Sequence, residues 1–544
     1  MSHFISAFLL LFFFSLNISH SYGIELFSKA FDEDSEFRME SDDVRERIQI
    51  FKEQKNYKKV AFYKLNYDLF DLKEESFDVG ESIKDPFSKS IIILNLFNDV
   101  KLVAYRDHVD ERGPNDFSWM GHVLNQQGSI VAIVIKDDKM AANIHTSEGE
   151  IYSVSWMGNG IHGVASYKEN NQTLNDAVIP PIGEPTPPSN PDTDADGTFI
   201  DVAVFYTSDA ASGLNIATDA QADIDATNIA LANSCVDYRY RLVNTASISY
   251  TETGNMSTDL NALRTDGDSL MDSVHTTRDS KGADLVALYT KDGGDYCGLA
   301  YVNSSSSYAF SITDVDCAYE TFAHELGHNM GLNHDRYQND EAKVDPTATR
   351  ISGFGWVSIA QRYRTIMSYS TECTAMGVSC PRVAYFSNPR VYYKGENMGI
   401  HNSIDSASVL NARRKTVASF KTAQSSYTPT ISGCLEDRAE VSGIGKCFIA
   451  TAAFGSPLSP YVNQFRKFRD KVLLRFSWGA EVVNWYYLNS PSFAKFIEGD
   501  RFLKIVSLTV LMPLALIIQS PLLFLTSLGI ILVAIILYRK KEAI

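Results

Sequence analysis

The sequence predicts a chain of three parts: a β-rich N-terminal region, an α/β (α+β) domain with a mixed sheet, and a helical tail. Three observations support this division. Apolar strand-like runs alternate with helical patterns between residues 198 and 424, short alternating runs precede them, and residues 505–538 contain no charged side chain. At 544 residues and 45% hydrophobic composition, the chain is long enough for more than one buried core.

The first 21 residues have the pattern of a signal peptide. Phe4 to Leu16 is apolar, and Ser19 and Ser21 place small residues where a signal peptidase reads them, which predicts cleavage before Tyr22. No Lys or Arg precedes the apolar run, so a short N-terminal anchor remains the alternative. Either interpretation predicts an exported protein.

The region 22–177 has the pattern of an antiparallel meander. Residues 129–135, 140–146, 151–156 and 161–167 are short apolar or alternating runs separated by polar turns. An independent β-rich binding module would show the same pattern, so the strands alone do not assign this region a role.

A Pro-rich linker is predicted over residues 178–197. It contains six prolines and should be extended and accessible to proteases. Asp192 to Gly197 imitates the start of a calcium loop, but position twelve is Ala203 and not a bidentate Glu. Ca²⁺ is therefore possible there but not supported by the sequence.

The domain predicted over residues 198–424 alternates strands with helices. Residues 200–206 and 285–289 are typical of buried strands, and residues 217–233 and 270–278 of the helices between them. This alternation predicts helices layered on a mixed sheet.

A metal-hydrolysis motif lies within residues 324–335. His324 and His328 are four residues apart on a helix, so both imidazoles face one side, and Glu325 falls beside them. Gly331 can adopt the left-handed conformation that turns the chain back and brings in His334. Three imidazoles leave a fourth position open for water, which predicts one catalytic Zn²⁺ with Glu325 as general base.

Thr365 to Tyr369 follows the motif as a Met-turn does, and here the sequence resembles the metzincin metallopeptidases. Asp335, directly after the third His, resembles the adamalysin/reprolysin branch, particularly its bacterial members. The resemblance extends from Phe199 to Lys421 and includes residues 200–206, 297–302 and 386–389. It implies a metzincin-like catalytic domain with an active-site helix.

The resemblance also implies roles for individual residues. Met367 would form the hydrophobic floor under the metal. Tyr369 departs from most eukaryotic adamalysins and is either a metal ligand or transition-state donor, or a packed aromatic. Strand 299–302 would be the antiparallel edge that holds substrate by strand addition, and residues 407–420 a closing helix. The implied substrate-binding residues are Gly298, Leu299, Ala300, Ser387, Asn388 and Pro389.

All seven cysteines lie at or after position 235. Cys373 and Cys380 would close a short disulfide loop in an exported chain, and the odd count leaves at least one thiol over. The resemblance implies that residues 22–177 are a pro-domain of a zymogen. No Cys occurs in residues 22–195, so latency through a thiolate on the metal is excluded.

A change of character after the linker at 425–446 predicts a membrane-associated tail. Cys447 to Ser456 resembles the Cys-Phe-Ile box of bacterial C-terminal tails. The remainder of 447–500 has apolar residues at helical spacing beside basic ones, which suits either a membrane-surface helix or a solvated basic face. Trp478 and Trp485 could belong to an interfacial belt.

The final segment, 501–544, is predicted to be a hydrophobic anchor. Pro513 and Pro521 should break it, leaving Leu522 to Tyr538 as one membrane span with the basic residues 539–541 in the cytoplasm. A hairpin of two short passes is the alternative.

These patterns together predict an exported, C-terminally tethered zinc metalloendopeptidase that cleaves peptide or protein substrates and is made as a zymogen. A surface adhesin on the same scaffold is the alternative, although it would have no need of Glu325. The net charge of −17 argues against nucleic acid as a partner. The sequence does not indicate an oligomeric state.

Overall fold

The computed structural model describes residues 24–32, 36–66, 91–113, 115–124, 126–168, 176–180, 196–338, 352–430 and Cys434, and in the tail 448–454, 501–519 and a few isolated positions. The chain divides into a compact unit, Glu25–Glu436, and a second unit formed by Met1–Ile24 and Asp437–Ile544. The predicted signal peptide and the predicted span at 522–538 lie outside the described residues.

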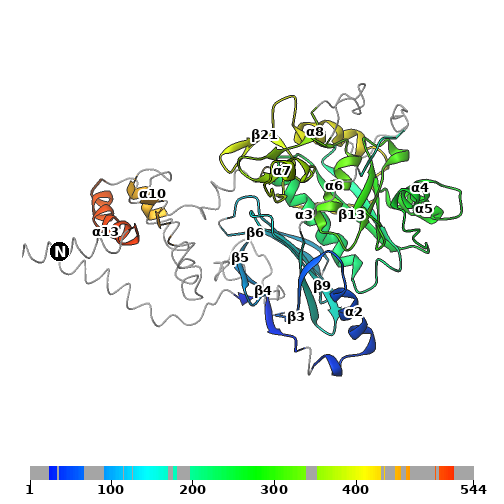
Figure 1. Cartoon of the computed structure of the whole chain (residues 1–544), viewed down its shortest axis with the longest axis horizontal. Helices are drawn as coiled ribbons and strands as arrows, with labels where there is room; N and C mark the ends of the chain where they lie inside the picture. The colour runs from blue at the N-terminus through cyan, green and yellow to red at the C-terminus, as the bar shows by residue number, and fades with distance from the viewer. Residues whose placement is uncertain are drawn as a thin grey trace, which may run out of the picture. The chain divides into compact units, whose positions relative to one another are not determined.

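The first part of the larger unit is a sheet with ten strands among the residues described, in the order β1-β4-β5-β6-β7-β8-β9-β10-β3-β2 (Figure 1). All neighbours from β4 to β10 pair antiparallel, which confirms the predicted meander. The strands are β1 (Ile24–Glu25), β2 (Phe27–Ala30), β3 (Tyr57–Leu65), β4 (Ile91–Phe97), β5 (Val100–Gly113), β6 (Asp116–Val123), β7 (Ile130–Lys136), β8 (Lys139–His145), β9 (Ile151–Gly158) and β10 (Ile161–Tyr167).

The second part is built on a six-stranded sheet in the order β11-β15-β16-β14-β12-β13. The neighbours β13, β12, β14 and β16 run parallel, β15 is antiparallel to β16, and β11 is parallel to β15. The predicted mixed sheet is therefore confirmed. The strands are β11 (Ala177–Val178), β12 (Phe199–Tyr206), β13 (Arg239–Ser247), β14 (Leu285–Thr290), β15 (Gly298–Tyr301) and β16 (Phe310–Asp314).

Helices cover both faces of this sheet. Side chains cap three of them: Asn215, Asn255 and Asp405 each accept a hydrogen bond from a backbone N–H in the first turn. Gly282, at φ 67°, supplies the left-handed residue that ends α5. The helices are α2 (Asp42–Lys52) in the N-terminal part, then α3 (Ile216–Asn233), α4 (Met256–Arg264), α5 (Asp272–Lys281), α6 (Tyr319–Asn329), α7 (Thr371–Ala375) and α8 (Ser406–Val417).

Helix α3 lies between the two sheets (Figure 1). It contacts β7 and β8 on one side and β13 on the other, and 15 of its 18 residues are buried. Ala222 packs with Val134 and Ala141 across the N-terminal sheet. This two-sided burial explains why α3 carries small and apolar residues around most of its circumference.

Two carboxylates of α3, the half-buried Asp223 and the buried Asp225, contact side chains of the N-terminal sheet. Asp223 accepts hydrogen bonds from Asn143 Nδ2 at 2.7 Å and the Tyr289 hydroxyl at 2.5 Å. Asp225 accepts one from the Ser118 hydroxyl. Burial raises the pKa of each carboxyl to about 6, and the Arg112 guanidinium opposes that rise at Asp225.

We expect the contact between sheet and helix to weaken as pH rises. Because the folded pKa values lie above the ordinary carboxyl value, the stabilisation is full below about pH 4 and is lost as pH rises through about 6. Each carboxyl should contribute roughly 3 kcal/mol. Comparing the thermal unfolding of the full chain at pH 4 and pH 7 measures this loss. Asp223→Asn should reduce the difference, exposed Asp237→Asn should not, and equal differences in all three proteins would contradict the prediction.

Three disulfides join cysteines of the described residues: Cys235–Cys434, Cys297–Cys317 and Cys373–Cys380. The predicted Cys373–Cys380 loop is confirmed. Cys297–Cys317 ties the residue before β15 to the residue two positions before α6. The remaining Cys447 lies outside the described residues.

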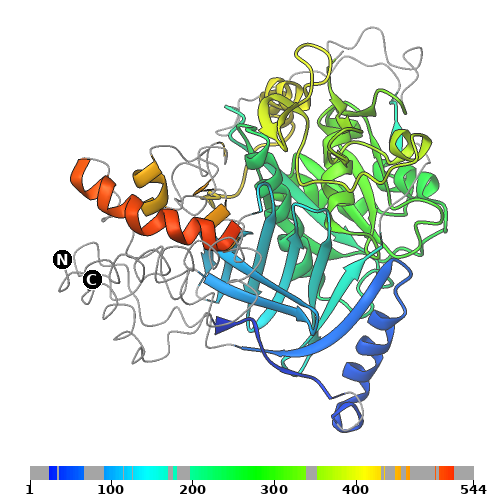
Figure 2. The same cartoon turned by 60° about the vertical axis from the view of Figure 1, so that its left-hand side comes forward.

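In the smaller unit, α10 (Phe448–Phe454) packs beside α13 (Arg501–Gln519) (Figure 2). The predicted break at Pro513 is wrong, because α13 continues through it. Proline removes one backbone hydrogen bond from a helix, but the loss of this bond does not end α13. Among the described residues, no helix combines the length and the apolarity needed to cross a membrane.

Candidate metal centre and its cleft

The metal motif begins on α6, whose residues are all buried. Gly327 lets the Met-turn approach the helix, because a Cβ there would lie 2.7 Å from Met367 Sδ. The chain then turns at Gly331, at φ 97°, as the sequence predicted, and His334 follows on the short strand β17 (Asn333–Asp335). Met367 itself is fully buried in the core beneath the helix.

His324, His328 and His334 converge on one point. Their ring centroids lie 4.6 to 5.2 Å apart, and the Nε2 atoms of His328 and His334 are 3.1 Å apart. His324 Nδ1 lies 2.9 Å from the Ile366 carbonyl, and His328 Nδ1 lies 2.8 Å from the Leu332 carbonyl. A carbonyl only accepts, so each Nδ1 carries the proton and each Nε2 keeps its lone pair for a metal.

Asp176 completes this group, and no sequence pattern indicated it. Its Oδ1 lies 2.5 Å from His334 Nε2, 3.2 Å from His328 Nε2 and 3.4 Å from His324 Nε2. Within the described part of the chain, these four buried residues form the one group of His, Cys, Asp and Glu side chains able to hold a metal ion, with ligand atoms within 4.8 Å of one another. The carboxylate therefore lies at the position that three imidazoles leave for a fourth ligand.

The strand after Asp176 occupies the predicted substrate edge. Ala300 N donates to the Asp176 carbonyl at 3.1 Å, and Val302 N donates to the Val178 carbonyl at 2.8 Å. The strand predicted at 299–302 is antiparallel to β16, as expected, but it is not an edge, because β11 covers it. The start of the predicted linker is also corrected: Val178 belongs to β11.

Glu325 lies beside the imidazoles with a carboxylate that has no hydrogen-bond partner among the described residues. Burial, and then the nearby Asp176 charge, raise its pKa well above the usual value. Gly298 gives the carboxylate room, since a Cβ there would lie 2.3 Å from Glu325 Oε1. Burial also lowers the pKa of His324 to about 3, which keeps this imidazole neutral as a metal ligand must be.

Tyr369 stacks on His334, with ring centroids 4.3 Å apart. Burial and the Asp176 carboxylate, which interacts with the Tyr369 hydroxyl, both raise the pKa of Tyr369. Asp335 Oδ2 accepts a hydrogen bond from Tyr369 N at 2.9 Å. Asp335 thus fixes the Met-turn beside the third imidazole, a role that its place in the motif did not reveal.

The other predicted site residues separate into two groups. Gly298, Leu299 and Ala300 form the start of β15, beside α6. Ser387 Oγ instead donates to the Phe354 carbonyl at 2.6 Å, and Asn388 Nδ2 to the Ser234 carbonyl at 2.8 Å. The side chains of Ser387 and Asn388 are thus tied into the domain interior, and Pro389 continues the strand β21 (Asn388–Tyr393).

Comparisons with known proteins agree with this geometry. The family described as "Metallo-peptidase family M12B Reprolysin-like" matches residues 218–335, from α3 to the residue after the third His. A peptidyl-Asp metalloendopeptidase of Stenotrophomonas maltophilia is 37% identical over 219 residues, which cover 39% of this chain and 50% of the relative. One of Xanthomonas campestris pv. campestris is 36% identical over 228 residues, covering 41% and 52%.

A shorter relative is matched almost completely. The peptidyl-Asp metalloendopeptidase of Pseudomonas fragi is 31% identical over 186 residues, which cover 34% of this chain and 89% of that protein. The chain spans about half the length of the other two relatives.

Proposed function

Because the chain belongs to the reprolysin-like metallopeptidases and, within them, to the family of the peptidyl-Asp metalloendopeptidases, we propose that it is a zinc-dependent endopeptidase. The observation that carries the proposal is the convergence of three imidazoles beside the buried Glu325 carboxylate, which has no hydrogen-bond partner among the described residues. A binding protein built on this scaffold would have no use for such a carboxylate, because burying it without a partner costs stability.

The donor set fits zinc. His324, His328 and His334 would hold the ion through Nε2, since the carbonyls of Ile366 and Leu332 engage Nδ1 of the first two. When bound, zinc would supply the Lewis acidity that brings the pKa of a water molecule near neutrality. Met367 would support the site from below, through its contact with α6 at Gly327.

Glu325 would act as the general base. Its carboxylate would accept the proton of the attacking water and then donate it to the nitrogen of the departing amine. A pKa raised by burial suits this task, because the group must both take and release a proton near neutral pH. Tyr369 stacks on His334, and we propose that its hydroxyl would donate to the oxygen that gains charge in the transition state.

Substrate would bind along β15 once β11 has left. The backbone N–H groups of Ala300 and Val302 now donate to β11 and would donate to the substrate instead. Such pairing recognises the backbone and not the sequence. The relatives are named for peptidyl-Asp, so we propose that the substrate carries an Asp at the bond that is cleaved.

We propose that the full-length chain is a zymogen held latent by Asp176. The carboxylate stands in the fourth ligand position, and β11 covers the strand that substrate needs. In other zymogens a thiolate of the pro-segment binds the metal. Here the Asp176 carboxylate would do so, in keeping with the absence of Cys from residues 22–195. Cleavage in the Pro-rich stretch that follows β11 would separate the N-terminal region from the catalytic domain.

Export is proposed on the signal-peptide pattern and is supported by the three disulfides, which persist in oxidising compartments. Tethering through the C-terminal tail, and the Cys-Phe-Ile box within it, stay predictions from the sequence.

The test is to cleave the full chain within residues 181–195, incubate it with a random peptide library and sequence the products. We expect one zinc per chain, cleavage beside Asp and loss of cleavage on chelation. A chain that binds zinc but cleaves no peptide would favour the adhesin alternative.

A further inference from the structure

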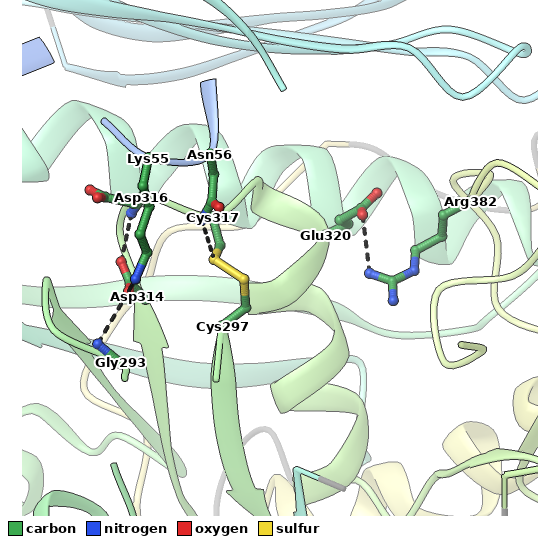
Figure 3. Close-up of a disulfide and its surroundings, with 9 residues drawn as sticks. All are labelled: Lys55, Asn56, Gly293, Cys297, Asp314, Asp316, Cys317, Glu320 and Arg382. Carbon is green, nitrogen blue, oxygen red and sulfur yellow. Dashed lines mark hydrogen bonds and ion pairs between the residues drawn. A yellow bond between two sulfur atoms is a disulfide. The ribbon is translucent and has the colours of Figure 1, made fainter. Parts of the chain in front are cut away.

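A buried ion pair lies one helical turn from the metal ligands. Glu320 precedes His324 by four residues, so both lie on the same face of α6, roughly 6 Å apart along its axis. Arg382 Nη1 is 3.0 Å from Glu320 Oε1 (Figure 3). Arg382 Nη2 also donates to the carbonyl of Ser368, the residue between Met367 and Tyr369, at 3.3 Å. The guanidinium thus lies between the active-site helix and the Met-turn.

The pair is buried but incompletely satisfied. Each side chain is 5% exposed. Among the described residues, neither Arg382 Nε nor Glu320 Oε2 has a hydrogen-bond partner. Unpaired buried groups of this kind are costly, and a ligand that supplies a partner relieves the cost. The positive charge of Arg382 also acts on Glu325, because it opposes the rise that burial causes in the pKa of that carboxyl.

A cavity of about 420 Å³ opens beside this pair. Cys297, Glu320, Arg364 and Arg382 line its wall in the catalytic domain, with two guanidiniums and one carboxylate. The opposite wall belongs to the N-terminal region and includes Asn56, whose Nδ2 donates to Cys317 Sγ at 3.2 Å (Figure 3). Removal of the N-terminal region would expose the catalytic-domain wall of this cavity, which carries a net positive charge.

The pocket lies at the first residue of β15. Cys297 directly precedes Gly298, and β11 passes the metal centre parallel to β15 and away from this end. Antiparallel pairing is more stable per residue, so substrate would run opposite to β11. The residues after the cleaved bond would then pass Gly298 and reach Cys297. The side chain that enters the pocket therefore belongs to the leaving half of the substrate.

We propose that Arg382 recognises an acidic side chain of the substrate residue that follows the cleaved bond, and so determines specificity. The inference rests on the proposed endopeptidase function and adds the residue that selects the substrate. The guanidinium would offer Nε and one Nη to the carboxylate, a geometry that planar Arg makes in two parallel hydrogen bonds. Glu320 holds the guanidinium in place before substrate arrives.

The test uses the full chain after linker cleavage and two peptides that differ only in Asp or Asn after the cleaved bond. Arg382→Met should lower kcat/KM for the Asp peptide roughly 10²-fold and change the Asn peptide little. Arg382→Lys should restore part of the preference. Glu320→Gln, which removes the competing charge, should lower KM for the Asp peptide. Arg414→Met, on α8 outside the cavity, is the matched control and should keep the preference.

The outcomes separate the two proposals. Wild-type protein that cleaves neither peptide refutes the proposed function itself. Wild-type protein that prefers Asp while Arg382→Met keeps that preference overturns only the role of Arg382, as does an equal loss on both peptides, which a structural role would give. Preference for Asp before the cleaved bond overturns the placement of the pocket. If Arg382→Met does not fold, the peptide preferences of the Arg382→Lys and Glu320→Gln variants test the role of Arg382 instead.

Discussion

Asp176→Ala is expected to make the uncleaved chain roughly 10²-fold more active toward a short peptide than the uncleaved wild-type chain. The carboxylate holds the fourth position beside three imidazoles, and losing an interaction of about 3 kcal/mol raises the population of the open cleft by that factor. Hydrolysis by intact chains, verified uncut by mass spectrometry, measures the effect. Activity should stay below that of the linker-cleaved chain, because β11 still pairs with β15.

Two comparisons make the Asp176 result specific. Ile179→Ala, at an exposed residue just after β11, should stay latent. Mercurials that modify thiols should not activate the full chain, because residues 22–195 contain no Cys to displace. An Asp176→Ala chain as latent as wild type, but activated by linker cleavage, would show that steric cover alone closes the site.

Glu325→Gln is expected to reduce peptide hydrolysis roughly 10²- to 10⁴-fold while zinc content stays at one per chain. Glutamine keeps the shape of the side chain and removes only the base. Because the carboxylate has no hydrogen-bond partner among the described residues, no native bond is lost, and removing a buried charge should leave thermal stability equal or higher.

The control for this variant is Glu372→Gln, on α7, which makes the same chemical change at a residue outside the group able to hold a metal and should leave turnover unchanged. Single-turnover hydrolysis and zinc analysis on the same linker-cleaved sample separate chemistry from metal loss. Wild-type turnover in zinc-loaded Glu325→Gln would reject Glu325 as the base.

Much of this arrangement was predictable because its signals are local. Helical spacing and one glycine turn in the motif at 324–335 predict three metal ligands and a general base, and the strands at 129–167 follow from alternating patterns. Strand β5 is long but mixes charged and apolar residues on both faces, so its pattern does not stand out. Strand β13 likewise carries polar residues among its apolar ones.

Asp176 could not be predicted, because nothing local distinguishes it. It lies 152 residues before His328 along the chain, next to a two-residue strand. Only the pairing of β11 with β15 brings it to the imidazoles, and such long-range pairing has no signature in sequence spacing. The Arg382–Glu320 pair joins residues 62 apart and escaped prediction for the same reason.

The placement of α3 between two sheets has a consequence for activation. Cleaving the linker breaks one covalent connection but leaves Ala222 packed against Val134 and Ala141, and Asp223 bonded to Asn143. We therefore expect the cut protein to be a complex of two fragments, whose free fraction obeys mass action. Activity per molecule should therefore rise on dilution. If the chain acts as proposed, its peptidase activity would be lowest where its local concentration is highest.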